Sequence, residues 1–106
     1  MAGYKSYTVF LTLLAEQERD DALEWYAKES ITVANRWLDE FDRLIERLED
    51  NPYQFAEHLL FIRRAKLARF PYHVFYAVDD INYAVEIIGV QHTSRDPAII
   101  RRRINF

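Results

Sequence analysis

The side chains that could carry acid–base chemistry in this sequence are its three histidines, His58, His73 and His92. His73 lies in the aromatic stretch RFPYHVFY, residues 69–76, and His92 stands three residues before Arg95. A metal-free ribonuclease needs a base for the 2′-hydroxyl proton, an acid for the leaving oxygen and cations for the phosphate. If they converge in the fold, the residues that could form such a set are His73, Tyr76, His92, Arg69 and Arg95.

A structural role is the competing interpretation of the same residues. Tyrosine and phenylalanine are common in strands, where their rings pack against neighbours, so Tyr72 and Tyr76 suit a core strand. His92 at a strand end could form a hydrogen-bonded corner, and Arg95 could hold the C-terminal segment. We therefore expect most of residues 69–76 to be core strand, with Arg69 and His73 acting outside the core.

The sequence lacks the spacings of other common sites. It has no cysteine, no HxxxH or HxH pair and no acidic residues placed to complete a ligand set, so we expect no metal and no cofactor. It also has no GxSxG segment and no glycine-rich loop after a strand. The sequence therefore does not predict the nucleophile elbow of an α/β-hydrolase or a phosphate-binding loop. Ser94, His92 and Asp96 are too close in sequence to form a relay.

Length and composition predict one domain, residues 1–106, with a substantial core. Half of the residues are hydrophobic and 15% are aromatic, which excludes a disordered chain. The absence of cysteine excludes a disulfide scaffold and fits the reducing cytoplasm. The apolar run TVFLTLLAEQ, residues 8–17, is too short and too soon interrupted by charge for a secretion signal or a membrane span. We therefore expect a cytoplasmic protein with no membrane partner.

The net charge of −3 conceals an asymmetry along the chain. Residues 1–60 hold 6 Lys/Arg and 13 Asp/Glu, a net −7, whereas residues 61–106 hold 8 and 4, a net +4. An acidic chain is not expected to bind nucleic acid through phosphates alone. The second half could instead present a basic surface to an acidic partner.

Periodicity predicts a strand followed by two helices. Residues 5–11 are rich in β-branched and aromatic side chains, as strands are, and Thr12 could cap the helix expected over 15–28. In the second helix, capped by Ser30 or Thr32, apolar residues recur every three or four positions: Ala34, Trp37, Leu38, Phe41, Leu44, Ile45 and Leu48. Asn51-Pro52 ends this helix, and the short connection makes the pair an antiparallel hairpin.

The rest of the chain predicts strands and a short final helix. Residues 60–67 and 72–78 are expected strands with Pro71 at the start of the second, and a turn at 79–82 leads to a strand over 83–92. The last two strands are apolar on both faces and should be central. Asp96-Pro97 then begins a helix over 98–103. The predicted fold is α+β, a helix hairpin packed on one face of a small, largely antiparallel β-sheet in the order β-α-α-β-β-β with a short C-terminal helix.

Three segments together resemble the RelE/ParE toxin superfamily of bacterial type II toxin–antitoxin modules. They are residues 22–52, RRAKLARFPYHVFYAVDD at 63–80 and IIGVQHTSRDP at 87–97, and the resemblance spans about residues 7–103. Its most specific part is the strand FPY-x-x-x-Y followed by H-x-x-R-D-P after a helix hairpin. The resemblance implies an antitoxin partner, whose tail wraps the toxin, and one of two mechanisms.

In this superfamily, ParE-like members inhibit DNA gyrase by binding it, and RelE-like members are ribosome-dependent mRNA endonucleases. The ending His92-x-x-Arg95-Asp96-Pro97 resembles the ParE, or plasmid-stabilisation, branch. The chain is not strongly basic, and His73 stands where some nucleases carry arginine. We therefore expect a ParE-like gyrase inhibitor, which would not be an enzyme. Its binding surface for the target or the antitoxin would contain Arg63, Arg64, Arg69, His92, Arg95, Trp25 and Tyr26.

Two alternatives stay open. One is a RelE-like endonuclease acting on mRNA at the ribosome, with His73 or His92 as base or acid, Tyr76 assisting, and Arg69 and Arg95 on the phosphate. The other is a degenerate family member without toxicity. In each case an antitoxin helix or strand could add at Trp25 and Tyr26 or at an open sheet edge, whereas the stripe that contains Trp37 predicts a core position for it. The chain would then form either a homodimer or a toxin–antitoxin hetero-oligomer.

Overall fold

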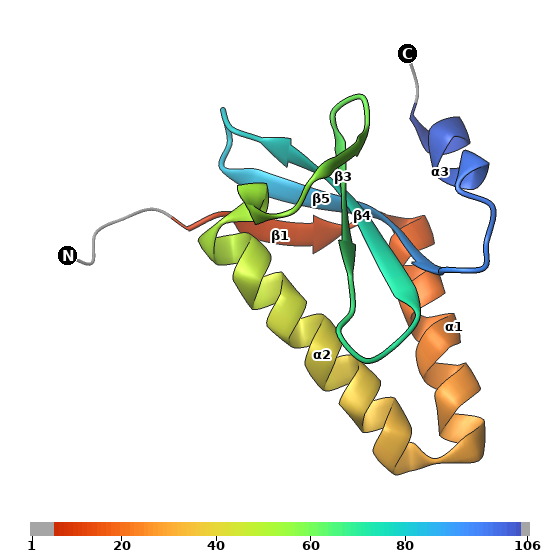
Figure 1. Ribbon diagram of the computed structural model, residues 1–106. Helices are drawn as coiled ribbons and strands as arrows, with labels where there is room; N and C mark the ends of the chain where they lie inside the picture. Colours follow the sequence, from red (N-terminus) through yellow and green to blue (C-terminus); the bar gives the residue numbers. More distant parts are fainter. Residues whose placement is uncertain (1–5, 105–106) are drawn as a thin grey trace.

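Figure 1 shows a computed structural model of the chain, in which residues 6–104 are described. The elements are β1 (Thr8–Leu11), α1 (Leu13–Glu29), α2 (Ile31–Asp50), a short 3₁₀ helix η1 (Pro52–Gln54), β2 (Glu57–Leu59), β3 (Ile62–Lys66), β4 (Tyr72–Asp79), β5 (Ala84–His92) and α3 (Ala98–Arg103). The strands form one sheet in the order β1-β5-β4-β3-β2. Among residues 6–104, β1 and β5 are the only neighbouring strands that run parallel. The predicted α+β fold with a largely antiparallel sheet is therefore confirmed.

The two long helices diverge as a V from their short connection (Figure 1), and they pack on one face of the sheet. The Thr12 hydroxyl accepts a hydrogen bond from the Ala15 N–H and caps α1, and the Ser30 hydroxyl caps α2 in the same way. Ser30 is both the C-cap of α1 and the N-cap of α2, so a single residue joins the helices. The helix α2 ends before Pro52, as predicted, because proline has no N–H and disfavours helix in the residue before it.

The main core lies between the hairpin and one face of the sheet. Trp37 is fully buried, stacks on Phe41 at 5.3 Å between ring centroids and meets Tyr72 edge-on at 5.5 Å. The other large buried side chains in this layer are Leu44, Leu48, Val74, Tyr76, Val85, Ile87 and Val90. The core position expected for Trp37 is confirmed, and so is the central place of β4 and β5 in the sheet.

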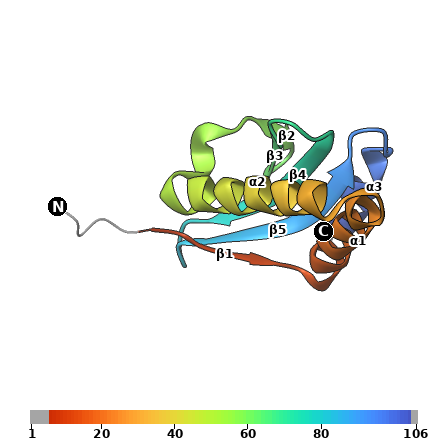
Figure 2. The same ribbon diagram turned by 90° about the horizontal axis from the view of Figure 1, so that it is seen from below.

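A second, smaller core lies on the other face of the sheet, where α3 packs. Ile100 of α3 is fully buried against Ile62 and Phe75. Gly89 of β5 lies beneath Ile100, and any side chain there would collide with it. Figures 1 and 2 both place α3 at the α1 end of the molecule. The helix therefore covers part of this face and leaves the rest open.

The boundaries of several elements differ from the prediction. The strand predicted over 60–67 is present as β3 but is shorter, and the strand β2 before it was not predicted. Leu60 adopts a left-handed conformation (φ 53°) in the turn between β2 and β3. The first strand begins at Thr8, and residue 5 of the predicted strand lies outside the described residues. Among the helices of residues 6–104, none is long and apolar enough to cross a bilayer.

Candidate functional site

A small basic pocket of about 90 Å³ lies on the sheet face opposite the hairpin, beside the turn that follows β5. Four of its lining residues carry the charge or the imidazole rings, and we call them the far-face cluster: Arg64, His73, His92 and Arg95. Arg64 of β3 pairs with Phe75 of β4, so its side chain shares a face with that ring and with His73. The structure therefore brings together Arg64 and three of the five residues proposed for a catalytic set.

The turn 92–95 explains why the spacing H-x-x-R places both side chains at one site. The Arg95 N–H donates to the His92 carbonyl at 2.9 Å, and the Ser94 N–H donates to His92 Nδ1 at 3.0 Å. The His92 ring also meets Tyr72 edge-on at 5.4 Å between centroids. His92, at the end of β5, pairs with Tyr72 and shares its face of the sheet, and from the strand end it also lines the far-face pocket. The turn fixes the orientation of its ring.

Two histidines flank the buried ring of Phe75 on the far face. The centroid of His58 lies 5.3 Å from that ring and the centroid of His73 lies 5.9 Å from it. Burial lowers the pKa of both imidazoles, and the nearby charge of Arg64 lowers the two pKa values further. For His73, Lys66 and His58 add to the effect. Both rings are therefore neutral near pH 7 and can accept a hydrogen bond or a proton.

The lowered pKa of His73 predicts a loss of stability in mild acid. As pH falls below the ordinary histidine value of 6.5, the unfolded chain binds the proton first, and the folded state loses stability until the pH reaches the lower folded pKa. We expect His73→Gln to reduce the drop in urea midpoint between pH 7.5 and pH 5.5. An unchanged drop in this variant would show that His73 does not contribute to the acid sensitivity.

The structure places Arg69 and Tyr76 away from this cluster. The backbone N–H of Arg69 donates to Glu40 Oε1 at 3.0 Å, which holds the β3–β4 loop against α2. Tyr76 is fully buried on the hairpin face, and its hydroxyl donates to the Pro52 carbonyl at 2.6 Å. Burial raises the pKa of Tyr76 to about 12. Tyr76 therefore cannot join His73 and His92 without a rearrangement of the core, and Arg69 lies beside α2, away from the far-face pocket.

The Tyr76 hydroxyl should matter for stability. Tyr76→Phe removes a buried hydrogen bond and leaves the Pro52 carbonyl without its donor, which should cost about 1–2 kcal/mol in the free energy of unfolding. Urea denaturation measures this loss. An unchanged free energy of unfolding would show that this hydrogen bond contributes no stability.

Arg63 is held within the fold and does not extend the far-face cluster. It pairs with Tyr76 across β3 and β4, and its guanidinium donates to the Phe55 carbonyl at 2.7 Å. The same group lies over the Tyr53 ring at 4.8 Å and within 3.8 Å of Glu57. These contacts assign Arg63 a bracing role between β3 and the segment after η1.

Trp25 is the exposed aromatic side chain of the hairpin, with 64% of its surface accessible. It lines a pocket of about 190 Å³ between α1 and the end of β5, which His92 and Arg95 also line. Tyr26 is half-buried and packs against Phe70 at 5.2 Å between ring centroids. Trp25 and the far-face cluster therefore form one continuous surface through His92 and Arg95, whereas Tyr26 supports the β3–β4 loop.

This surface offers guanidinium groups, neutral imidazoles and an exposed indole. Arginine and tryptophan are enriched among the residues that contribute most of the binding energy at protein–protein interfaces. No group of three or more His, Cys, Asp or Glu residues that could hold a metal ion occurs within residues 6–104. The set proposed from the sequence included His73 and His92 but not His58. Its place beside Phe75 depends on β2, a strand that was not predicted.

A known family matches most of the chain. A family model described as the ParE toxin of the type II toxin–antitoxin system parDE matches residues 9–97. That span begins in β1 and ends at Pro97, after the turn that carries His92 and Arg95. The chain matches no curated protein.

Several solved structures share the fold. The chromosomal ParDE system of P. aeruginosa aligns with a TM-score of 0.69 at 15% identity, over 82% of this chain and 96% of that one. A mutant of the E. coli toxin RelE in the free state gives 0.64 at 17% identity, over 94% and 99%. The RelBE2 toxin–antitoxin complex of Mycobacterium tuberculosis gives 0.57 at 21% identity, over 83% and 92%.

Proposed function

This chain belongs to the ParE toxin family of type II toxin–antitoxin systems, and from that premise we propose that it inhibits DNA gyrase by binding it. The observation that carries the proposal is the family match over residues 9–97, which includes the hairpin, the sheet and the turn 92–95. In a plasmid-stabilisation module, this activity would be held in check by a cognate antitoxin. The ParDE and RelBE2 structures that share the fold are toxin–antitoxin systems, which supports an antitoxin as partner.

The surface proposed to contact gyrase contains Trp25, Arg64, His92 and Arg95. An exposed indole beside two arginines suits an anchor on a protein surface, and the arginines would draw in an acidic partner. The expected catalytic set is incomplete at this surface, because Arg69 and Tyr76 lie elsewhere, and this favours binding over cleavage. In this proposal the histidines of the far-face cluster act as contact residues.

The proposal predicts which process stops first in growing cells. After induction of the protein without antitoxin, incorporation of labelled thymidine should fall before incorporation of labelled leucine, because gyrase inhibition blocks replication. Simultaneous expression of the antitoxin should restore both. If leucine incorporation fell first, the gyrase proposal would be wrong. If neither changed, the chain would be a family member without toxicity.

One observation favours RelE-like mRNA cleavage as a second candidate. His58 and His73 are neutral rings on the same face as Arg64, a combination that could accept a proton and hold a phosphate. Translating ribosomes incubated with the protein, followed by mapping of mRNA ends, test this candidate. An absence of new ends would remove it, and so would full cleavage by the double variant His73→Ala/His92→Ala.

A further inference from the structure

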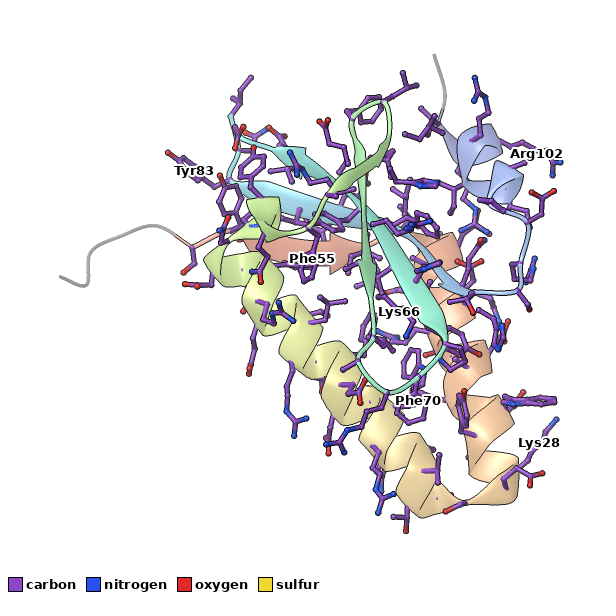
Figure 3. All side chains as sticks on the ribbon, in the orientation of Figure 1. Lys28, Phe55, Lys66, Phe70, Tyr83 and Arg102 are labelled. Atoms are coloured by element: carbon purple, nitrogen blue, oxygen red, sulfur yellow. The ribbon has the colours of Figure 1, made fainter. Side chains whose placement is uncertain are left out.

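Two adjoining hollows run along α2 on the side where the β3–β4 loop lies. Their volumes are about 340 and 240 Å³, and they share Glu40, Arg43 and Arg69. We call them together the α2 groove. Its remaining lining residues are Val33, Arg36, Asp39, Leu44, Arg47, Lys66, Leu67, Ala68 and Phe70. Figure 3 labels Lys66 at the end of β3 and Phe70 in the β3–β4 loop.

The α2 groove is basic although it lies on the acidic half of the chain. Arg36, Arg43 and Arg47 follow one another at spacings of seven and four, which places them on one side of the helix. Lys66 and Arg69 add two cations from the facing strand and loop, whereas Asp39 and Glu40 are the acids of the groove. The groove therefore holds five cations and two carboxylates, and the Glu40 carboxylate already accepts a hydrogen bond from the Arg69 backbone.

Three of these guanidinium groups have no anionic partner. Glu40 stands four residues after Arg36, where it could form an ion pair, but its carboxylate instead accepts the backbone N–H of Arg69. Within residues 6–104, Arg36, Arg43 and Arg69 form no ion pair within 4.0 Å. Arg47 is committed to Gln54, and the Lys66 ammonium donates to backbone carbonyls of its own loop. The groove thus presents unpaired donors suited to carboxylates.

The dimensions of the α2 groove suit a peptide segment. From Val33 to Arg47 the helix rises about 21 Å, at about 1.5 Å per residue. An extended strand covers that length with about six residues. Val33 and Phe70, which are half-buried, supply apolar surface between the arginines. The complementary ligand is therefore a short segment with two or more carboxylates and an apolar side chain.

We infer that the α2 groove receives an acidic segment of the cognate antitoxin, an inference that rests on the proposed toxin–antitoxin module. The groove shares no residue with the far-face cluster or with Trp25, so it can hold one partner while the surface proposed for gyrase serves another. The inference requires the antitoxin to contain about six consecutive residues with at least two acids and one large apolar residue.

Charge reversal in the α2 groove tests the inference with the purified antitoxin from the adjacent reading frame as the probe. Arg43 lines both hollows and is exposed, so Arg43→Glu should weaken antitoxin binding about tenfold or more without unfolding the protein. Arg43→Gln, which only removes the charge, should weaken it less. The matched control is Lys28→Glu on α1, because Lys28 is exposed and does not line the groove (Figure 3). This control should bind within twofold of wild type.

Calorimetric titration at low and moderate salt gives the readout. The affinity of the Arg43→Glu variant should also fall less steeply with salt than that of wild type, because fewer ionic contacts remain. Wild-type affinity in the Arg43→Glu variant would overturn the inference while leaving the module intact. An antitoxin that did not bind the wild-type protein would overturn the module as well. The assay contains no gyrase, so its outcome is independent of the target.

Discussion

Arg64→Glu/Arg95→Glu is expected to abolish growth inhibition and to raise by a hundredfold or more the amount of protein needed to inhibit gyrase. Both side chains are exposed and lie at the pocket of the far-face cluster, where reversal places two negative charges against an acidic partner. Charge reversal at a contact surface affects association and dissociation together, which gives effects of several kcal/mol. The thermal midpoint should stay close to the wild-type value.

A matched double variant on α3 separates this local effect from a change in total charge. Arg101→Glu/Arg102→Glu alters the net charge by the same amount, and neither residue lines the far-face pocket or the Trp25 pocket. Figure 3 shows Arg102 pointing away from the body of the molecule. This variant should keep inhibitory activity within a few-fold of wild type. Equal losses in both double variants would show that long-range charge, and not the far-face cluster, governs the activity.

Glu18→Leu is expected to produce the largest loss of stability, about 3 kcal/mol in the free energy of unfolding. The Glu18 carboxylate accepts two hydrogen bonds of 2.8 Å from the Arg103 guanidinium. It also accepts the Val90 N–H at 2.9 Å and the Gln91 side-chain amide at 3.1 Å. The substitution leaves an arginine with a side chain only 17% exposed beside an apolar residue, and it releases the contact that joins α3 to α1 and β5.

The same carboxylate predicts a pH dependence. Burial by itself would raise the pKa of Glu18, but the hydrogen bonds from Arg103, Val90 and Gln91 outweigh it and lower the pKa overall. A lowered carboxylate pKa stabilises the fold above the unfolded value near 4.5, and this contribution is lost as pH falls through the folded pKa. Urea denaturation from pH 7 to pH 3 should therefore show a steeper acid loss for wild type than for Glu18→Leu.

The exposed acid Glu24 on the same helix provides the control for this prediction. Glu24→Leu should change the free energy of unfolding by less than about 0.5 kcal/mol. The double variant Glu18→Leu/Arg103→Leu should be more stable than the sum of the two single losses predicts, because it leaves no unpaired charge. A loss below about 0.5 kcal/mol for Glu18→Leu would show that α3 is held by the packing of Ile100 alone.

The fold could be predicted because its determinants are local. The apolar stripe that ends at Leu48, the cap at Ser30 and the proline at position 52 each fix part of the hairpin without reference to distant residues. Apolar residues on both faces of β4 and β5 placed these strands in the centre of the sheet. The turn between β2 and β3 depends on the left-handed conformation of Leu60. Leucine rarely adopts this conformation, so the sequence did not predict the turn.

Only part of the candidate site could be predicted, because side chains come together only if they lie on the same face of the sheet. His73 and Tyr76 are three residues apart on one strand, so alternation alone puts them on opposite faces. The bulge in this ladder, where Ile88 is extra in β5, leaves the alternation of β4 intact. Arg69 lies in a loop whose path is set by the Glu40 contact, a long-range interaction that spacing cannot reveal. The turn 92–95, by contrast, is local and did bring its histidine and arginine together.

The central claim is that this family member acts on gyrase through contact and not through cleavage of RNA. The most direct measurement is plasmid supercoiling by purified gyrase, titrated with the folded protein in the absence of ribosomes and RNA. We predict that supercoiling decreases as the ratio of protein to gyrase rises, and that equimolar antitoxin restores it. Undiminished supercoiling at a large molar excess of folded protein would contradict the account.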